Sequence, residues 1–255
     1  MTIDYSRQEE FAVIRLNRPE ALNALSFGLI RELDQALDQV ARSGARSLLL
    51  IGAGEKAFCA GADIAELANR SLTQTHRDTR FGQSVFSKIE DLPMPSVAII
   101  NGYAFGGGLE LALACSFRLA TANAKLGLPE IKLGLIPGYG ATQRLPRVVG
   151  PTRALEMIMS GKTLDAATAV AWGLVSRMVE GDALAAGMVF AREFSGFSLP
   201  VLKLARQAVQ DACEMPLPQG LKTEADLSTL AYQTADAAEG MAAFLAKRMP
   251  QFKDA

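Results

Sequence analysis

Two glutamates stand in settings that favour acid–base chemistry. A buried strand predicted over 97–100 breaks at Asn101-Gly102, passes the triple glycine 106–108 and opens a helix with Glu110 in or near its first turn. Glu130 follows Pro129 in an apolar stretch further along the chain. Consecutive glycines let a ligand approach the backbone, and the first N–H groups of a helix have no partner within it. Two carboxylates near such donors predict acid–base catalysis on a polarised carbonyl group.

Both glutamates lie within motifs that follow one another along nearly the whole chain. The sequence resembles the enoyl-CoA hydratase/isomerase (crotonase) superfamily, and specifically its 2-enoyl-CoA hydratases. The resemblance implies an α/β fold, a crotonase-like spiral of repeated ββα units with a C-terminal helical trimerisation region, often stacked into hexamers. We expect the spiral core over 1–195 and the helical region over 196–255. The motifs that carry the resemblance are 16–24, 57–64, 101–112, 129–131, 137–145 and 248–253.

The resemblance implies a role for each of five residues. The main-chain N–H groups of Ala62 and Gly107 would form an oxyanion hole for the thioester oxygen. Glu130 would deliver a proton to the α-carbon, Glu110 would activate or orient the water, and the N–H of Gly138 would contact that water. Two close carboxylates in an apolar pocket do not both ionise cheaply, so we expect one to stay protonated near neutral pH.

Each glutamate also has a purely structural interpretation. Glu110 would be an acid favoured by the helix dipole, and Glu130 would be a surface residue of a turn. The catalytic interpretation rests on both glutamates together with the surrounding glycine motifs.

Coenzyme A contacts are likewise implied by the resemblance. The turn that contains Ala60, Asp63 and Ile64 would lie along the adenine and pantetheine arm, and Phe252 and Lys253 would reach the nucleotide from the chain end. Asp63 has a second interpretation as a simple helix N-cap, and the chain end has one as an amphipathic segment that packs on a neighbour. Many relatives carry a basic residue at the position of Ala65, so one phosphate or adenine contact is expected to be missing. No cofactor is implied, because coenzyme A is part of the substrate.

The acyl pocket is less well defined by the sequence. Tyr139 replaces a small residue that is common between two glycines of this motif, and we expect it to crowd the pocket. We interpret 69–80 as a polar, mobile segment that helps to shape this pocket, followed by a helix over 81–89. Acyl length, branching and pathway are therefore not predicted.

Three other functions stay open. An enoyl-CoA isomerase of the same fold needs only one carboxylate, and the presence of Glu110 beside Glu130 argues against it. Dehydration of a different 3-hydroxyacyl-CoA would use the same pair. A non-catalytic or RNA-binding member of the family is disfavoured because the chain lacks an arginine–aromatic cluster.

The amino-acid composition limits the classes of binding partner that we expect for this chain. The 26 basic and 27 acidic residues nearly cancel, so neither nucleic acid nor an anionic membrane surface is indicated. The three cysteines have no paired spacing and His76 is the only histidine, which disfavours a disulfide framework, a metal site and a histidine-based triad. The N-terminus does not resemble a targeting segment. We expect a cytoplasmic homotrimer or homohexamer that acts on acyl-CoA.

A glycine pattern at 52–57 is similar to a dinucleotide-binding motif. Gly52-Ala53-Gly54 and Ala57 formally fit the G-x-G-x-x-G/A dinucleotide fingerprint after a buried strand over 48–51. The fingerprint should open directly into a helix, whereas 58–61 intervenes here, so we do not interpret it as a dinucleotide site.

The remaining pattern supplies the scaffold. Strands are predicted at 3–6, 11–16 and 117–120, and a helix over 29–40 with Ser26 as its N-cap. A short helix is expected at 63–68. Beyond Pro151 the chain reads as mostly helical, with a hinge at 196–200. The helices predicted there are 151–160, 165–172, 182–194, 199–212 and 220–248, the last in two pieces.

Overall fold

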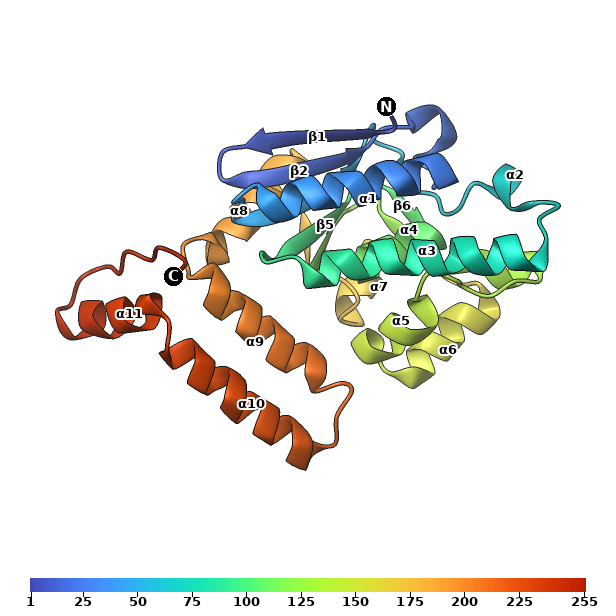
Figure 1. The fold of residues 1–255 in the computed structure, drawn as a ribbon. Coiled ribbons are helices and arrows are strands. Elements are labelled where there is room, and N and C mark those ends of the chain that lie inside the picture. The colour runs from blue at the N-terminus through green and yellow to red at the C-terminus, as the bar shows by residue number, and fades with distance from the viewer. The chain divides into compact units, whose positions relative to one another are not determined.

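The computed structural model describes residues 1–255 and divides the chain into two units. The first unit comprises Met1–Leu92 and Ser96–Ala191, and the second comprises Pro93–Pro95 and Arg192–Ala255. Figure 1 follows the chain from the blue strands of the first unit to the red helices of the second. None of the helices is both long and apolar enough to cross a lipid bilayer.

Two sheets form the first unit. Six strands follow the order β1-β2-β3-β5-β7-β10, and four shorter strands follow the order β4-β6-β8-β9. The pairs β1–β2 and β8–β9 are antiparallel, and all other neighbours are parallel. The strands are β1 (Ile3–Gln8), β2 (Phe11–Leu16), β3 (Ser47–Gly52), β4 (Ala57–Cys59), β5 (Ser96–Ile100), β6 (Tyr103–Phe105), β7 (Phe117–Thr121), β8 (Lys125–Gly127), β9 (Thr163–Asp165) and β10 (Arg177–Val179).

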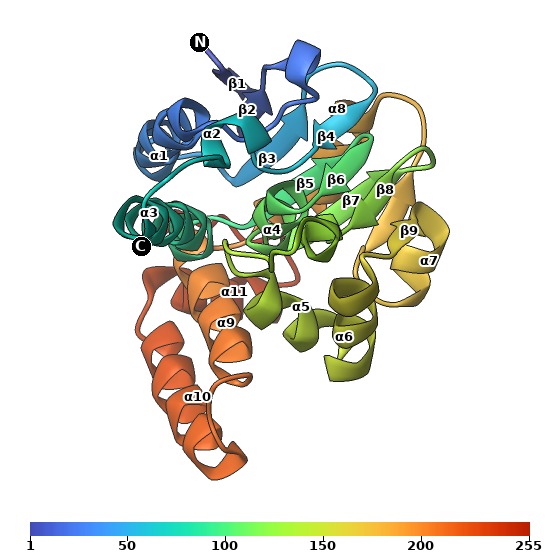
Figure 2. The ribbon, with the colours of Figure 1, turned by 90° about the vertical axis from the view of Figure 1, so that its right-hand side faces the viewer.

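Three strand pairs, β3/β4, β5/β6 and β7/β8, repeat one pattern. The first strand of each pair joins the six-stranded sheet, the second joins the four-stranded sheet, and a helical segment follows. Figure 2 shows β3, β5 and β7 as successive strands of one sheet, with β4, β6 and β8 next to them. The corner between two strands is tight: a Cβ atom built on Gly102 would lie 2.3 Å from the carbonyl oxygen of Lys56. The predicted α/β spiral of ββα repeats is therefore confirmed.

Helices cover these sheets. Ser26 begins α1 as predicted, since its hydroxyl accepts a hydrogen bond from Leu29 N at 3.1 Å. Helices α1 and α3 pack side by side. The helices of this unit are η1 (Pro19–Ala21), α1 (Phe27–Arg42), α2 (Ile64–Leu67), α3 (Leu72–Asp91), α4 (Gly107–Leu113), η2 (Pro129–Leu133), α5 (Ala141–Val149), α6 (Pro151–Ser160), α7 (Ala166–Ala171) and α8 (Ala183–Ser195), whose last residues belong to the second unit.

The helix predicted over 81–89 begins earlier than expected and takes in much of the polar segment 69–80. Most of it belongs to α3, which begins at Leu72 and runs to Asp91. Its start is a capping box: Ser71 Oγ accepts from Gln74 N at 3.2 Å, and Gln74 Oε1 accepts from Ser71 N at 3.0 Å. These reciprocal bonds satisfy the first N–H groups of the helix, so a polar sequence forms a helix here.

The glycine fingerprint at 52–57 does not begin a helix. Gly52 ends β3, and Ala57 begins β4 after a turn. A Cβ atom built on Gly52 would lie 2.3 Å from the carbonyl oxygen of Ala57. The glycine at position 52 thus serves the tight strand corner, and the structure supports the rejection of a dinucleotide site.

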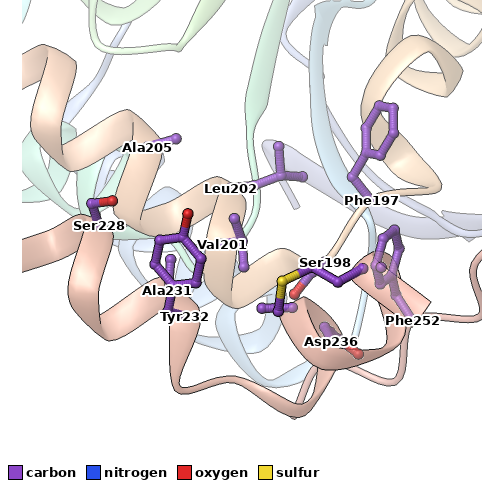
Figure 3. Close-up of a pocket in the computed structure, with 13 residues that line it drawn as sticks. Phe197, Ser198, Val201, Leu202, Ala205, Ser228, Ala231, Tyr232, Asp236 and Phe252 are labelled. Carbon is purple, nitrogen blue, oxygen red and sulfur yellow. The ribbon is translucent and has the colours of Figure 1, made fainter. Parts of the chain in front are cut away.

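The second unit is helical, with α9 (Leu199–Asp211), α10 (Leu217–Tyr232) and α11 (Ala235–Leu245). The helix predicted over 220–248 is indeed divided, at 233–234. Arg206 Nη1 donates to the carbonyl oxygen of Met94 at 2.7 Å, which ties the segment 93–95 to this unit. A mainly apolar pocket of about 500 Å³ lies among these helices, with Phe197 and Phe252 in its lining (Figure 3).

Candidate active site

Glu110 is held by a fully buried helix. Strand β6 ends at Phe105, and Gly106 then adopts φ 49° and ψ −124°, a conformation that requires glycine. Helix α4 begins at the next residue, and all seven of its residues are buried. The side chain of Glu110 is only 2% exposed. The glycine turn therefore brings a carboxyl group into the interior.

Main-chain donors fix the Glu110 carboxyl group. Its Oε1 atom accepts hydrogen bonds from Tyr139 N at 2.7 Å and Ala141 N at 2.9 Å. Burial raises its pKa, the main-chain donors lower it and the nearby charge of Glu130 raises it, and the resulting pKa is about 7. Neither main-chain bond engages Oε2. One oxygen is thus anchored, and the group as a whole titrates near neutral pH.

Glu130 lies on η2 and approaches the glycine turn. A Cβ atom built on Gly106 would lie 2.8 Å from Glu130 Oε1, so only glycine leaves room for this carboxyl group. Its Oε2 atom is buried without a hydrogen-bond partner. Burial raises the pKa of Glu130 as well. Both carboxyl groups therefore favour the protonated state more than free glutamate does.

The two glutamates line one cavity of about 480 Å³. Most of its walls come from α2, α3, η2 and the loops that follow β4 and precede α5. Apolar side chains predominate, with a smaller polar group on α3 and just before it. The cavity is lined by Phe27, Ala60, Gly61, Ala62, Ile64, Leu67, Arg70, Thr75, Asp78, Thr79, Gly106, Gly107, Glu110, Pro129, Glu130, Leu133, Leu135, Ile136, Gly138 and Tyr139.

Two main-chain N–H groups in this lining are unused. Leu25 pairs with the residues on either side of Ala62, through Leu25 N to Gly61 O at 2.8 Å and Asp63 N to Leu25 O at 2.9 Å. The N–H of Ala62 itself makes no hydrogen bond within the protein. Gly107 is the first residue of α4, and its N–H is likewise unpaired. Ala62 N lies 3.5 Å from a Cβ atom built on Gly107, so the two groups are neighbours.

A polar network that the sequence analysis missed holds the loop before α5. Gln83 Nε2 donates to Gly138 O at 2.8 Å, and Arg144 Nη1 donates to Tyr139 O at 3.0 Å. Arg144 also binds Glu90 with two hydrogen bonds, Nε–Oε1 at 2.7 Å and Nη2–Oε2 at 2.5 Å. This loop supplies the donors to Glu110, so the network positions the carboxyl group indirectly. Only the fold brings these distant residues together.

Tyr139 packs into a space that α3 leaves open. A Cβ atom built on Gly82 would lie 2.4 Å from Tyr139 Cε1, and Phe86 meets the tyrosine ring edge-on with centroids 5.4 Å apart. On another side the ring approaches Gly107, where an added Cβ atom would lie 3.4 Å from Tyr139 Cδ2. The tyrosine is therefore a wall of the cavity next to the unpaired N–H of Gly107.

The residues predicted to contact coenzyme A lie in both units and do not all line the cavity. Ala60 and Ile64 line the cavity, whereas Asp63 is not among its lining residues. Asp63 caps α2 through a bond from Ala65 N at 3.2 Å and forms an ion pair with Arg18 at 3.1 Å. In the second unit, Phe252 lines the apolar pocket and Lys253 N donates to Asp236 Oδ1 at 2.7 Å; both residues belong to that unit.

Thiol chemistry finds no support in the structure. Burial raises the pKa of Cys59 and of Cys115 to about 12 in each case, so both are protonated at neutral pH. All three cysteines are free thiols. His76 is exposed on α3, and no three His, Cys, Asp or Glu side chains gather in an arrangement that would hold a metal ion.

The repeated ββα units, with the buried Glu110 and the half-buried Glu130 in one cavity, define an α/β enzyme of the crotonase fold. The family model described as enoyl-CoA hydratase/isomerase matches residues 6–255, and the chain belongs to this family.

Individual relatives agree with the family assignment. The chain is 42% identical over 253 residues to a Rhizobium meliloti protein named "Probable enoyl-CoA hydratase", covering 99% of this chain and 98% of the relative. It is 40% identical over 249 residues to a crotonyl-CoA hydratase of Syntrophomonas wolfei, covering 96% and 95%. A crystal structure of an enoyl-CoA hydratase from Bacillus anthracis superposes with a TM-score of 0.94 at 37% identity and covers 100% of both chains.

Proposed function

We propose that this protein is a 2-enoyl-CoA hydratase that adds water across the α,β double bond of an enoyl-CoA thioester to give the 3-hydroxyacyl-CoA. One observation carries the proposal: two carboxyl groups with raised pKa values line the same cavity as two unpaired N–H groups. This combination suits a reaction that needs an acid, a base and a site for a developing oxyanion. The names of the relatives support the same activity.

In this proposal, Ala62 and Gly107 stabilise the thioester oxygen. Addition at the β-carbon moves negative charge onto that oxygen, and two preorganised N–H donors lower the energy of this charge. Gly107 is the first residue of α4, so the positive end of the helix dipole adds to the effect. Because the donors are main-chain groups, the residue types at these positions do not determine the chemistry.

The two glutamates divide the proton transfers. The water oxygen forms a bond to the β-carbon while one water proton passes to the ionised carboxylate of Glu110. The double-bond electrons form a bond from the α-carbon to the proton carried by Glu130. We also propose that the N–H of Gly138 contacts the water held between the two carboxyl groups. Hydration leaves the single proton of the pair on Glu110, and exchange with solvent returns it to Glu130 before the next turnover; one proton on the pair agrees with the raised pKa of each group.

The coenzyme A part of the substrate needs its own contacts. We propose that the turn with Ala60, Asp63 and Ile64 follows the pantetheine arm, and that Phe252 and Lys253 contact the nucleotide. No resident cofactor is required in this scheme. We also propose a cytoplasmic homotrimer or a dimer of trimers, supported by the free thiols and by the many exposed apolar side chains of the second unit.

Isomerisation of the double bond is the main alternative within the family. It requires one carboxyl group to move a proton between carbons, whereas hydration uses both. The anchoring of Glu110 by two main-chain donors favours hydration, because these bonds aim a second carboxyl group at the cavity. Dehydration of another 3-hydroxyacyl-CoA would use the same geometry in reverse.

The test follows the loss of enoyl thioester absorbance with crotonyl-CoA. We expect turnover by the wild type, and a loss of about 10²- to 10⁴-fold in kcat for Glu110→Gln and for Glu130→Gln. Calorimetric binding of a 3-hydroxyacyl-CoA should stay nearly intact in both variants. Glu180→Gln alters an exposed glutamate outside the cavity and serves as the matched control.

Two outcomes contradict the proposal. Absence of turnover with enoyl-CoA thioesters of several lengths would favour a non-catalytic role. Loss of acyl-CoA binding in both glutamine variants, with no separate loss of kcat, would show that the two carboxyl groups are structural.

A further inference from the structure

One face of α3 gives the cavity a polar wall. Thr75, Asp78, Thr79 and Gly82 follow the spacing i, i+3, i+4 and i+7 of a single helix face. Gly82 packs on Tyr139, and Thr79 Cγ2 lies 3.6 Å from a Cβ atom built on Gly138. Asp78 and Thr75 therefore lie progressively further along the helix from the loop that anchors the catalytic carboxyl group.

Arg70 adds a charged donor to this wall. Its guanidinium lies 4.3 Å above the centroid of the Phe27 ring and forms an ion pair with Asp78. Asp78 is only 8% exposed, and it also binds Arg77 Nε at 3.0 Å. Two guanidinium groups thus share one carboxylate. The Nε–H of Arg70 is left without a partner in a buried position.

The hydroxyl group of Tyr139 is a second unpaired donor. The residue is only 7% exposed and lines the cavity, and its hydrogen bonds are made by its main-chain N–H and carbonyl groups, not by its hydroxyl. Burial raises the pKa of Tyr139 to about 12, so the hydroxyl keeps its proton; the charge of Glu110 acts in the same direction and that of Arg70 in the opposite one. Tyr139 and Arg70 line the same cavity, and α3 connects them: Arg70 pairs with Asp78, one helical turn before Gly82, on which the tyrosine ring packs.

A purely hydrocarbon acyl chain fits this wall poorly. Methylene groups packed against it would take water away from the Tyr139 hydroxyl and from the part of the Arg70 side chain that is still exposed, 20% of it, without supplying an acceptor. An oxygen atom on the acyl chain would supply that acceptor. The exposed Glu66 is the nearest further acid on the sequence, but its carboxylate accepts from Phe27 N at 2.6 Å.

We infer that the preferred substrate is an enoyl-CoA whose acyl chain carries an oxygen function, as a hydroxyl or a carboxylate, that binds Arg70 and the Tyr139 hydroxyl. This inference rests on the proposed hydratase function and specifies its substrate class. Asp78 lies four residues before Gly82, which corresponds to about 6 Å along the helix axis. An acyl chain of six carbons, with the oxygen function at its end, is therefore the natural first probe.

The experiment compares three acyl chains of equal length. Initial rates of hydration are measured with hex-2-enoyl-CoA, 6-hydroxyhex-2-enoyl-CoA and hex-2-enedioyl-CoA, with crotonyl-CoA as the baseline substrate. We expect kcat/KM for at least one oxygenated substrate to exceed that for hex-2-enoyl-CoA about 10-fold or more, since one satisfied buried donor accounts for such a factor. A preference for the carboxylate identifies the charge of Arg70 as decisive, and a preference for the hydroxyl identifies a neutral hydrogen bond.

Two variants then test the residues. Arg70→Met keeps an unbranched stem without donors, and Tyr139→Phe removes only the hydroxyl. The readout is the ratio of kcat/KM between oxygenated and alkyl substrates, which should fall towards one in at least one variant. Arg31→Met replaces an exposed arginine on α1 outside the cavity, and it should leave the ratio unchanged.

The outcomes separate this inference from the proposed function. No turnover of any substrate, crotonyl-CoA included, overturns the hydratase proposal. Turnover of crotonyl-CoA and hex-2-enoyl-CoA without a preference for either oxygenated substrate overturns only the inference. A preference that neither Arg70→Met nor Tyr139→Phe reduces overturns the assignment to these residues.

Discussion

The environment of Glu110 sets its protonation state through opposing effects. Complete burial favours the neutral acid, and the charge of Glu130 acts in the same direction. The N–H donors of Tyr139 and Ala141 favour the carboxylate. The result is a pKa of about 7, where a carboxyl group exchanges its proton most readily at neutral pH.

This raised pKa predicts a pH-dependent stability. The folded state binds a proton with a pKa of about 7, whereas the ordinary value is 4.5, so the contribution is fully present below pH 4.5 and is lost as the pH rises through about 7. Urea unfolding of the wild type and of Glu110→Gln checks this. The wild-type free energy of unfolding, relative to the variant, should fall by roughly 3 kcal/mol across that range. A constant or rising difference would show that the pKa of Glu110 is not raised in the folded protein.

At the scale of the element, α4 lies unusually close to β4. A Cβ atom built on Gly108 would lie 2.1 Å from the carbonyl oxygen of Cys59, an impossible distance unless helix and strand separate. The second and third glycines of the triple thus have different uses: Gly107 offers its N–H to the cavity, and Gly108 permits close packing. Both uses are needed to place Glu110.

Gly108→Ala should therefore destabilise the protein by about 1–3 kcal/mol, the usual cost of overpacking a buried site. Gly220→Ala is the matched control, because nothing lies within 4 Å of the added atom on α10 and the change should stabilise by about 0.4–1 kcal/mol. Thermal unfolding followed by circular dichroism measures both. Equal stability of the two variants would contradict the close approach of α4 and β4.

The start of α3 shows where sequence reasoning failed at this scale. A polar stretch with no apolar periodicity reads as a loop, yet Ser71 and Gln74 have the spacing of a capping box. This capping-box spacing is present in the sequence, and it predicts that the helix begins near Ser71 instead of at position 81. The pairing of Arg70 with Asp78 was not available in the same way, because it depends on how the turn after α2 folds back on the helix.

At the scale of the whole molecule, the ordered motifs were sufficient to predict the α/β spiral and the family. Glu110, Glu130, Ala62 and Gly107 were named from those motifs, and the structure places all four in the lining of one cavity. The residues that support them could not be named. Gln83 reaches Gly138 across 55 residues and Arg144 reaches Glu90 across 54, and such contacts leave no local pattern.

Exposed apolar side chains in the second unit lead us to predict that copies of this chain associate with one another. Phe244, Leu245 and Met249 are 83%, 82% and 85% exposed, and apolar surface of this kind favours contact with another copy. Light scattering should give a mass three or six times the 27.2 kDa of one chain. Phe244→Asp should shift the distribution towards smaller species, and a wild-type mass of a single chain would contradict the proposed assembly.

The contact between Gly82 and Tyr139 also constrains how this chain diverges from its relatives. Because a side chain at position 82 would collide with the tyrosine ring, position 82 is restricted to glycine as long as position 139 carries this ring. A homologue with alanine or a larger residue at position 82 must carry a smaller residue at position 139. The two sites should therefore covary, and a lineage that acquires the aromatic ring must already have lost the β-carbon opposite it.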